Sequence, residues 1–227
     1  MHCCNSKITL IVAAAGSGKR MKLGYPKQFL EIDGKPLFLK VLELAENIKV
    51  IADVIVVTGD EFVKYIENEC FKNGIHKVSK VISGGNERQY SIEKALAHCS
   101  NDSIIAVQDG VRPFLKENYF TDALEILKND SMVDGVVVGV PLKDTIKKID
   151  LEGFVVETPK REEFIAVHTP QIFRGEILKK AYLKAKNEGF LGTDDSSLVE
   201  RIGGKVRVLI GDYDNIKITT VEDLKHL

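Results

Sequence analysis

The chain has 227 residues and a formal net charge of −1, and its composition is 44% hydrophobic and 29% charged. These values are ordinary for a globular α/β protein that buries a sizeable core without disulfide bonds. A near-neutral charge argues against a general nucleic-acid or acidic-membrane surface, so we expect neither kind of partner. Any bound anion must therefore be held by a local cluster of lysines and arginines.

The cysteines and the N-terminal segment predict a cytoplasmic protein. Cys3, Cys4, Cys70 and Cys99 form no Cys-x-x-Cys pair, and their spacing suits neither a disulfide framework nor a zinc site. We therefore expect free thiols. The apolar stretch 8–15 is too short to span a bilayer and is unlike a signal sequence.

Six runs rich in Val and Ile are predicted strands, at residues 8–13, 54–58, 78–82, 104–107, 135–140 and 206–210. Helical patterns lie between them, at about residues 36–47, 61–71, 87–98, 117–128 and 176–187. Runs that are apolar on both faces are typical of a sheet covered on both sides. The alternation of strands and helices predicts a mostly parallel, doubly wound sheet, which binds ligands at the carboxyl ends of its strands.

One segment departs from this alternation. Residues 145–149 and 154–157 flank the sequence DLEG, which is typical of a hairpin turn that ends in glycine. A two-stranded hairpin is barely stable by itself in water, so it must lie against the body or against another subunit. The chain shows no internal repeat and no linker, and we predict one domain over residues 1–227.

The first functional motif, AAAGSGKRM at residues 13–21, directly follows the first predicted strand. Its small residues and two glycines let backbone N–H groups approach an anion closely, and Lys19 and Arg20 add positive charge. It is neither a Walker loop nor a dinucleotide fingerprint, since the third glycine position holds Met21. The alternative is a tight strand-to-helix turn with two solvated cations.

The next motif is PKQF at residues 26–29, in which Pro26 limits where Lys27 can point. A Pro-Lys pair carries no information alone, but here it follows the glycine-rich motif closely. The combination resembles nucleotidyltransferases that activate sugars and polyols, in which an arginine and a lysine clamp a triphosphate.

Two further motifs follow predicted strands. GGNERQYS at residues 84–91 places two glycines where a backbone can approach a flat base, with Asn86 as an alternative helix N-cap. QDGVRP at residues 108–113 places Asp109 at the carboxyl end of a buried strand. Asp109 is a candidate to meet a substrate hydroxyl or to help hold Mg²⁺, and Arg112 is a candidate to bind a second phosphate.

Later segments are weaker signals. Thr193, Asp194 and Asp195 are explained by the start of a helix, where acidic residues are favoured. Lys217 alternates with apolar neighbours, as an exposed strand residue does. None of the five histidines has metal-ligand or triad spacing, and we assign them no role.

Taken together, these blocks resemble the 2-C-methyl-D-erythritol 4-phosphate cytidylyltransferase family from residue 8 to about residue 224. The resemblance implies a Rossmann-like fold similar to nucleotide-diphospho-sugar transferases, with a protruding β-arm at about 141–170 that embraces the partner in a homodimer. It implies transfer of CMP from CTP to the polyol phosphate in non-mevalonate isoprenoid precursor biosynthesis, with Mg²⁺ or another divalent cation as cofactor.

The resemblance also implies roles for individual residues. Catalytic cations that bind the triphosphate are Arg20, Lys27 and Lys217. CTP-binding positions are Ala14, Ala15, Gly16, Ser17, Gly18, Gly85, Asn86, Arg88 and Ser91, with Asn86 standing where the family usually has Asp. Positions around the polyol phosphate are Asp109, Arg112, Thr145, Arg161 and Thr169, some of them supplied by the arm of the other subunit.

The alternative is ribitol-5-phosphate cytidylyltransferase, which shares the loop, the PKQF block and the NIK block. The chain differs from that relative at Ala14-Ala15-Gly16 and at Thr193-Asp194-Asp195, and in the KDTIK sequence of its arm. A hexose-1-phosphate nucleotidyltransferase lacks the segments at 158–161 and 168–171. A non-catalytic nucleotide-binding module is expected to lose at least one of the three cations, and all three are present.

Overall fold

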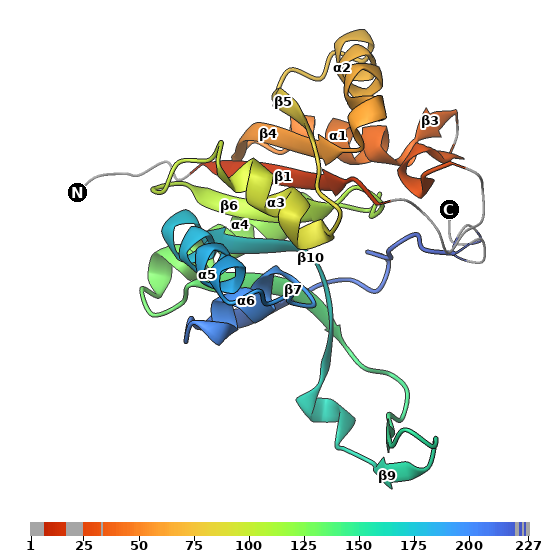
Figure 1. Ribbon diagram of the computed structural model, residues 1–227, viewed down its shortest axis with the longest axis vertical. Coiled ribbons are helices and arrows are strands. Elements are labelled where there is room, and N and C mark those ends of the chain that lie inside the picture. The colour runs from red at the N-terminus through yellow and green to blue at the C-terminus, as the bar shows by residue number, and fades with distance from the viewer. Residues whose placement is uncertain (1–6, 17–24, 33, 221–222, 224, 226–227) are drawn as a thin grey trace.

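The computed structural model describes residues 7–16, 25–32, 34–220, 223 and 225. Seven strands form one sheet in the order β11-β7-β10-β6-β1-β4-β5 (Figure 1). The strands are β1 (Ile8–Ala14), β4 (Ile51–Thr58), β5 (Val78–Ser83), β6 (Ile104–Asp109), β7 (Gly135–Pro141), β10 (Ile165–Arg174) and β11 (Val206–Ile210). All six predicted strands are present; β11 has the predicted bounds, and the other five are one to three residues longer than predicted.

Most strand pairs are parallel, as predicted. β1 is parallel to β4 and β6, β4 to β5, and β11 to β7. β10 is antiparallel to both β6 and β7, and the sequence did not predict it. Proline in the middle of a run argues against a central strand. Here Pro170 falls where the register with β7 shifts, between Val167 and Gln171, so no regular pairing is lost at that point.

Six helices of the described chain cover the two faces of the sheet. They are α1 (Leu37–Asn47), α2 (Val63–Lys72), α3 (Arg88–Leu96), α4 (Glu117–Asn129), α5 (Gly175–Asn187) and α6 (Asp195–Arg201). One buried cluster joins one face of the sheet to α1, α2 and α4, and a second joins the other face to α3, α5 and α6. This confirms the predicted α/β class. A short hairpin, β2 (Glu31–Ile32) with β3 (Lys35–Pro36), was not predicted.

The predicted hairpin is also present. β8 (Lys148–Ile149) pairs antiparallel with β9 (Val155–Glu157), and Gly153 adopts a φ of 89° in the turn between them. Figure 1 shows this arm projecting well away from the sheet, beyond the ends of β7 and β10. One chain therefore leaves most of the arm without neighbours.

Two of the four cysteines lie in described parts of the chain. Cys70 and Cys99 are buried free thiols, as the sequence predicted. Burial raises the pKa of each thiol to about 11, so neither is ionised near neutral pH. Cys3 and Cys4 lie outside the described residues. Within the described ranges, we find no helix with the length and apolar character needed to cross a bilayer.

Close packing between β7 and β10 generates a test of the core. A Cβ added to Gly135 would overlap the ring of Phe173, coming within 2.6 Å of its Cε1 atom. We expect Gly135→Ala to lower the free energy of unfolding by about 1–3 kcal/mol, because overpacking forces buried groups to shift. Urea unfolding measures this loss. In a double-mutant cycle Phe173→Leu should relieve part of it, whereas strictly additive losses would contradict the overlap.

Candidate active site

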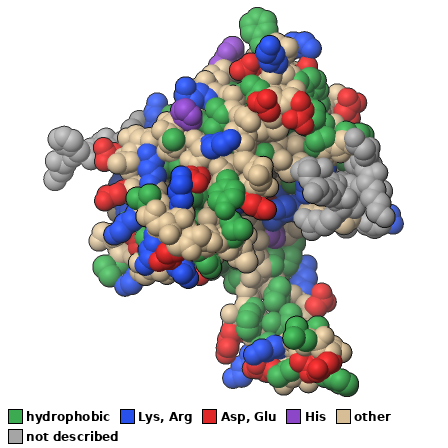
Figure 2. All heavy atoms as spheres, in the orientation of Figure 1, with side chains coloured by type: hydrophobic (Ala, Val, Ile, Leu, Met, Phe, Trp, Pro, Cys, Tyr) green, Lys and Arg blue, Asp and Glu red, His purple; other side chains and the backbone are tan. Residues whose placement is uncertain are grey.

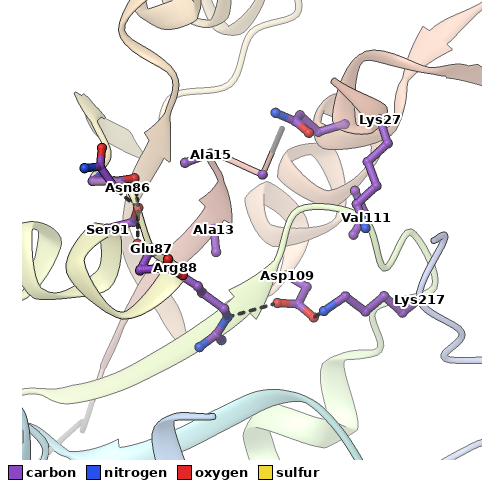
Figure 3. Close-up of a pocket in the computed structure, with 13 residues that line it drawn as sticks. Ala13, Ala15, Lys27, Asn86, Glu87, Arg88, Ser91, Asp109, Val111 and Lys217 are labelled. Atoms are coloured by element: carbon purple, nitrogen blue, oxygen red, sulfur yellow. Dashed lines mark hydrogen bonds and ion pairs between the residues drawn. The ribbon is translucent and has the colours of Figure 1, made fainter. Parts of the chain in front are cut away.

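A cavity of about 530 Å³ lies at the carboxyl ends of β1 and β6 (Figure 3). Side chains and backbone from several distant segments line it. They are Ala13, Ala15, Gly16, Lys27, Gln28, Gly85, Asn86, Glu87, Arg88, Ser91, Asp109, Val111 and Lys217. The cavity therefore collects residues of the four strongest sequence motifs together with Lys217. Its position is the one expected for ligands of a parallel sheet.

The end of β1 is fixed to the segment that carries Lys27. Gln28 donates from Nε2 to the Ala14 carbonyl at 2.6 Å, and the hydroxyl of Thr58 reaches the same oxygen at 3.3 Å. Gln28 is almost fully buried in a 3-10 turn that begins at Lys27. The turn therefore holds Lys27 beside the first residues of the glycine-rich motif. Ser17, Gly18 and Arg20 lie outside the described residues.

The GGNERQYS motif forms a tight connection between β5 and α3. Ser91 accepts from the Gly85 amide at 2.9 Å and donates to the Glu87 carbonyl at 3.0 Å. A Cβ on Gly84 would lie 2.7 Å from the Ser91 oxygen, so this turn requires glycine. The alternative role of Asn86 as helix N-cap is wrong, because α3 begins at Arg88 and Glu87 occupies the N-cap position.

Asp109 lies at the centre of the charged part of the site. Lys217 Nζ is 2.8 Å from its Oδ2, Arg112 Nε is 3.6 Å from the same oxygen, and Arg88 Nε is 3.5 Å from Oδ1. Burial by itself would raise the pKa of Asp109, but the charges of the three cations outweigh it and hold this pKa below its ordinary value. Asp109 is therefore ionised at neutral pH.

A second buried carboxylate, Asp195, orients Arg88. Arg88 donates from Nη2 to Asp195 Oδ2 at 2.7 Å, and the Tyr182 hydroxyl donates to Oδ1 at 2.5 Å. Burial would lower the pKa of Arg88, but Asp195 and Asp109 raise it above its ordinary value. Arg88 is thus a cation bridge between the two carboxylates.

The helix-start explanation of Asp194 and Asp195 is confirmed, since α6 begins at Asp195, but it does not account for the burial of Asp195. Asp194 caps α6 by accepting from the Ser197 amide at 2.9 Å, whereas Asp195 is fully buried and pairs with Arg88. Its partner is 107 positions away in the sequence, so no local signal reveals this pair.

Five other predicted site residues that the structure describes do not line the cavity, and the first is Ala14, whose carbonyl is occupied by Gln28 and Thr58. Arg112 is buried behind Asp109 and donates to the Asn215 carbonyl at 2.6 Å, and Thr169 accepts from the Asp109 amide at 3.0 Å. Thr145 and Arg161 are exposed, and neither lines the cavity. Arg112 and Thr169 therefore support Asp109 from behind, whereas Thr145 and Arg161 do not contribute to this cavity within one chain.

Residues that the sequence did not single out also line the cavity: Ala13, Gln28, Glu87 and Val111. Gln28 stands inside the PKQF motif, where a polar residue between Lys and Phe was the available signal. Lys217 is not in a strand, contrary to the alternation pattern. It belongs to a loop that is fixed by the bond from the Ile218 amide to the Val111 carbonyl, at 2.9 Å.

The described residues test the predicted metal site. Among them we find no group of three or more His, Cys, Asp or Glu side chains that could hold a metal ion. Asp109 is the predicted ligand, and its Oδ2 is already paired with Lys217. The residues therefore fit a magnesium ion only where nucleotide phosphates supply most of its ligands, with Asp109 contributing at most one carboxylate.

Comparison with known proteins identifies the family. The family model described as IspD, 2-C-methyl-D-erythritol 4-phosphate cytidylyltransferase, matches residues 8–226. A protein of that name from Fusobacterium nucleatum is 52% identical over 225 residues, covering 97% of this chain and 95% of the relative. Another from Alkaliphilus metalliredigens is 41% identical over 221 residues, covering 96% and 90%.

A solved structure agrees with the sequence comparisons. The crystal structure of 4-diphosphocytidyl-2C-methyl-D-erythritol synthase from Anaerococcus prevotii superposes with a TM-score of 0.84 at 30% identity, covering 97% of this chain and 94% of the other. The match of the family model over nearly the whole chain shows that the protein belongs to the 2-C-methyl-D-erythritol 4-phosphate cytidylyltransferase family.

Proposed function

We propose that this chain transfers CMP from CTP to 2-C-methyl-D-erythritol 4-phosphate and releases pyrophosphate, as a step of non-mevalonate isoprenoid precursor biosynthesis. The observation that carries the proposal is the meeting of Lys27 and Lys217 in one cavity, beside Ala15 and Gly16, in a member of this family. The two lysines come from opposite ends of the chain. A polyanion is the ligand that suits such a convergence of cations and backbone N–H groups.

The chemistry of this reaction needs little from a general base. A phosphate monoester is largely dianionic near neutral pH, because its second pKa is about 6. Its oxygen attacks the α-phosphorus of CTP, the bond from that phosphorus to the bridging oxygen breaks, and pyrophosphate leaves with the electron pair. The task of the protein is to hold two polyanions together and to stabilise the charge that develops.

The proposed division of labour follows the cavity. Arg20, Lys27 and Lys217 bind the triphosphate, together with backbone groups of Ala14, Ala15, Gly16, Ser17 and Gly18. Gly85, Asn86, Arg88 and Ser91 bind the nucleoside end. Asp109, Arg112 and Thr169 act around the polyol phosphate, with Thr145 and Arg161 from the arm of a second chain. A magnesium ion held mainly by the phosphates would neutralise part of their charge.

Arg88 acts through its fixed position in this scheme. Its guanidinium is held by Asp195 on one side and lies 3.5 Å from Asp109 on the other. A guanidinium held on both sides keeps one position in the wall of the cavity, from which Arg88 can contact the nucleoside end. Asp195 thus fixes the position of Arg88 beside Oδ1 of Asp109, while Lys217 pairs with Oδ2.

Homodimer formation through the arm is part of the same proposal. Large apolar side chains are exposed on and beside the arm: Ile149, Leu151, Phe154, Val155, Val156, Phe164 and Val167. Figure 2 shows hydrophobic side chains gathered there among charged ones. Two short strands do not stabilise such a surface alone, and a second copy of the chain would cover it. The cytoplasmic location and the single domain over residues 1–227 stay predictions.

Purified protein tests the reaction directly. Mixed with CTP, ATP, GTP or UTP and either 2-C-methyl-D-erythritol 4-phosphate or ribitol 5-phosphate, it should release pyrophosphate fastest with CTP and the erythritol compound. Faster turnover of ribitol 5-phosphate would establish the alternative substrate.

Lys27→Ala should lower kcat about a hundredfold or more, because a cation that stabilises the transferred charge is lost. Lys64→Ala, at an exposed lysine of α2, is the control and should match the wild type.

Asp195→Asn tests the fixed position of Arg88. Loss of the charged bond should lower the free energy of unfolding by about 1.5–3 kcal/mol. Misplacement of Arg88 and Lys217 should lower kcat on the order of 10- to 100-fold. Tyr182→Phe keeps the ion pair and removes one hydrogen bond, so its kcat should stay within about threefold. Equal losses of kcat in both variants, or none in Asp195→Asn, would refute this role.

The arm generates a test of the dimer by sedimentation. Phe154 is 71% exposed, and its burial in a partner would contribute about 1.5–3 kcal/mol. Phe154→Asp should therefore weaken the dimer about 10- to 100-fold. Phe71→Asp, at a phenylalanine of α2 that is 89% exposed, should leave the mass unchanged. A monomeric wild type at micromolar concentration would count against the dimer.

A further inference from the structure

The arm leaves the sheet through a stretch without strand pairing. Pairing of β7 with β10 ends at Pro141 and Ile165, and pairing within the arm begins at Lys148 and Glu157. The unpaired stretches are residues 142–147 and 158–164, all of which the structure describes. No β-sheet pairing joins these outgoing and returning segments of the arm. Side-chain contacts must therefore set the direction in which the arm leaves the body.

One of these contacts comes from the body of the protein. The Tyr213 hydroxyl donates to the Pro141 carbonyl at 2.8 Å, and Lys143 Nζ lies 3.5 Å from the centroid of the Tyr213 ring. Pro141 is the last residue of β7, and Lys143 is two residues into the unpaired stretch. Tyr213 thus touches the outgoing segment on both sides of the point where pairing stops.

The loop that carries Tyr213 is itself firmly attached. The Gly211 amide donates to the Gly139 carbonyl at 2.9 Å, and Asp212 pairs with Lys116 and accepts from the Tyr119 hydroxyl, at 3.0 and 2.8 Å. Further along, the fully buried Asn215 donates to the Thr169 carbonyl at 2.9 Å. Tyr213 is therefore a fixed support, against which the more weakly held arm rests.

Lys143 connects Tyr213 to the returning segment of the arm. Arg161 donates from Nη1 to the Lys143 carbonyl at 2.6 Å. A continuous series of contacts thus runs from the attached loop through Tyr213 and Lys143 to Arg161. Arg161 is one of the two arm residues to which the proposed function gives a role in the site of a second chain.

We propose that Tyr213 is a positioning residue that sets the exit angle of the arm and thereby places Arg161. This inference rests on the proposed function for its effect on catalysis. A preformed exit angle reduces the disorder that must be lost when the arm binds a second copy, which favours both the dimer and the site that the arm completes.

Kinetics separate this role from a general structural one. Tyr213→Ala should raise the KM for 2-C-methyl-D-erythritol 4-phosphate and the dimer Kd, each about 3- to 10-fold, since a hydrogen bond and a cation–ring contact are lost. The KM for CTP should stay within about twofold, because Lys217 is held by other bonds. Tyr213→Phe and Lys143→Met should each give part of the effect, and Tyr65→Phe, at a half-exposed tyrosine of α2, should give none.

Hydrogen exchange tests the exit angle without reference to activity. Amides of residues 142–147 should exchange about 2- to 10-fold faster in Tyr213→Ala than in the wild type. Unchanged exchange together with an unchanged dimer Kd would overturn the inference, even in a protein that proved to have another substrate. Equal rises of both KM values would also overturn it, since they would assign Tyr213 to the cavity rather than to the arm.

Discussion

The site depends on the ionised carboxylate of Asp109. Three cations lie within 3.6 Å of it, and without it they would repel one another in a poorly solvated space. Asp109 and Asp195 carry two negative charges against the three positive charges of Arg88, Arg112 and Lys217. The cluster therefore keeps one surplus positive formal charge, and Lys27 and Glu87, which line the same cavity, cancel each other in this count. Binding of an anionic ligand would neutralise this surplus positive charge.

The order of strands explains why this charged cluster lies where the glycine-rich motif begins. β6 lies between β1 and β10, so the carboxyl end of β6 places Asp109 beside Ala13 on one side and Thr169 on the other. The Gly110 amide donates to the Ala13 carbonyl at 2.9 Å, which ties the two strand ends together. The nucleotide and the second substrate are thereby directed to adjacent positions. Positioning of this kind is the main demand of phosphoryl transfer.

The sequence predicted those parts of the fold that have a local cause. Runs of Val and Ile become strands because both faces of the sheet are covered, and the turn of the arm follows from its glycine. The antiparallel strand β10 was missed because Pro170 normally excludes a central strand, while here it sits at a shift of register. The prediction thus failed because an exception to the proline rule depends on the register with a neighbouring strand.

The candidate site likewise contains residues that the sequence could predict and residues that it could not. Asp109 was predictable because it follows a buried strand, and Lys27 because its motif lies close to the glycine-rich one. The pair of Arg88 and Asp195 was not predictable, since it joins residues 107 positions apart and Asp195 has an adequate local explanation as a helix start. The two side chains meet because α5 packs against both α3 and α6 in one buried cluster.

The arm residues show a different limit, because one chain does not bring them to the cavity. Thr145 and Arg161 are exposed in this chain, and neither lines the cavity that holds Lys27, Asp109 and Lys217. No rearrangement within one chain is needed to use them, because the arm already projects from the body with apolar side chains exposed. Under the proposed dimer, the residues that the resemblance assigned to one substrate are supplied by two chains. The unit that carries out the proposed reaction is then the pair of chains, and the geometry at the root of each arm becomes part of the active site.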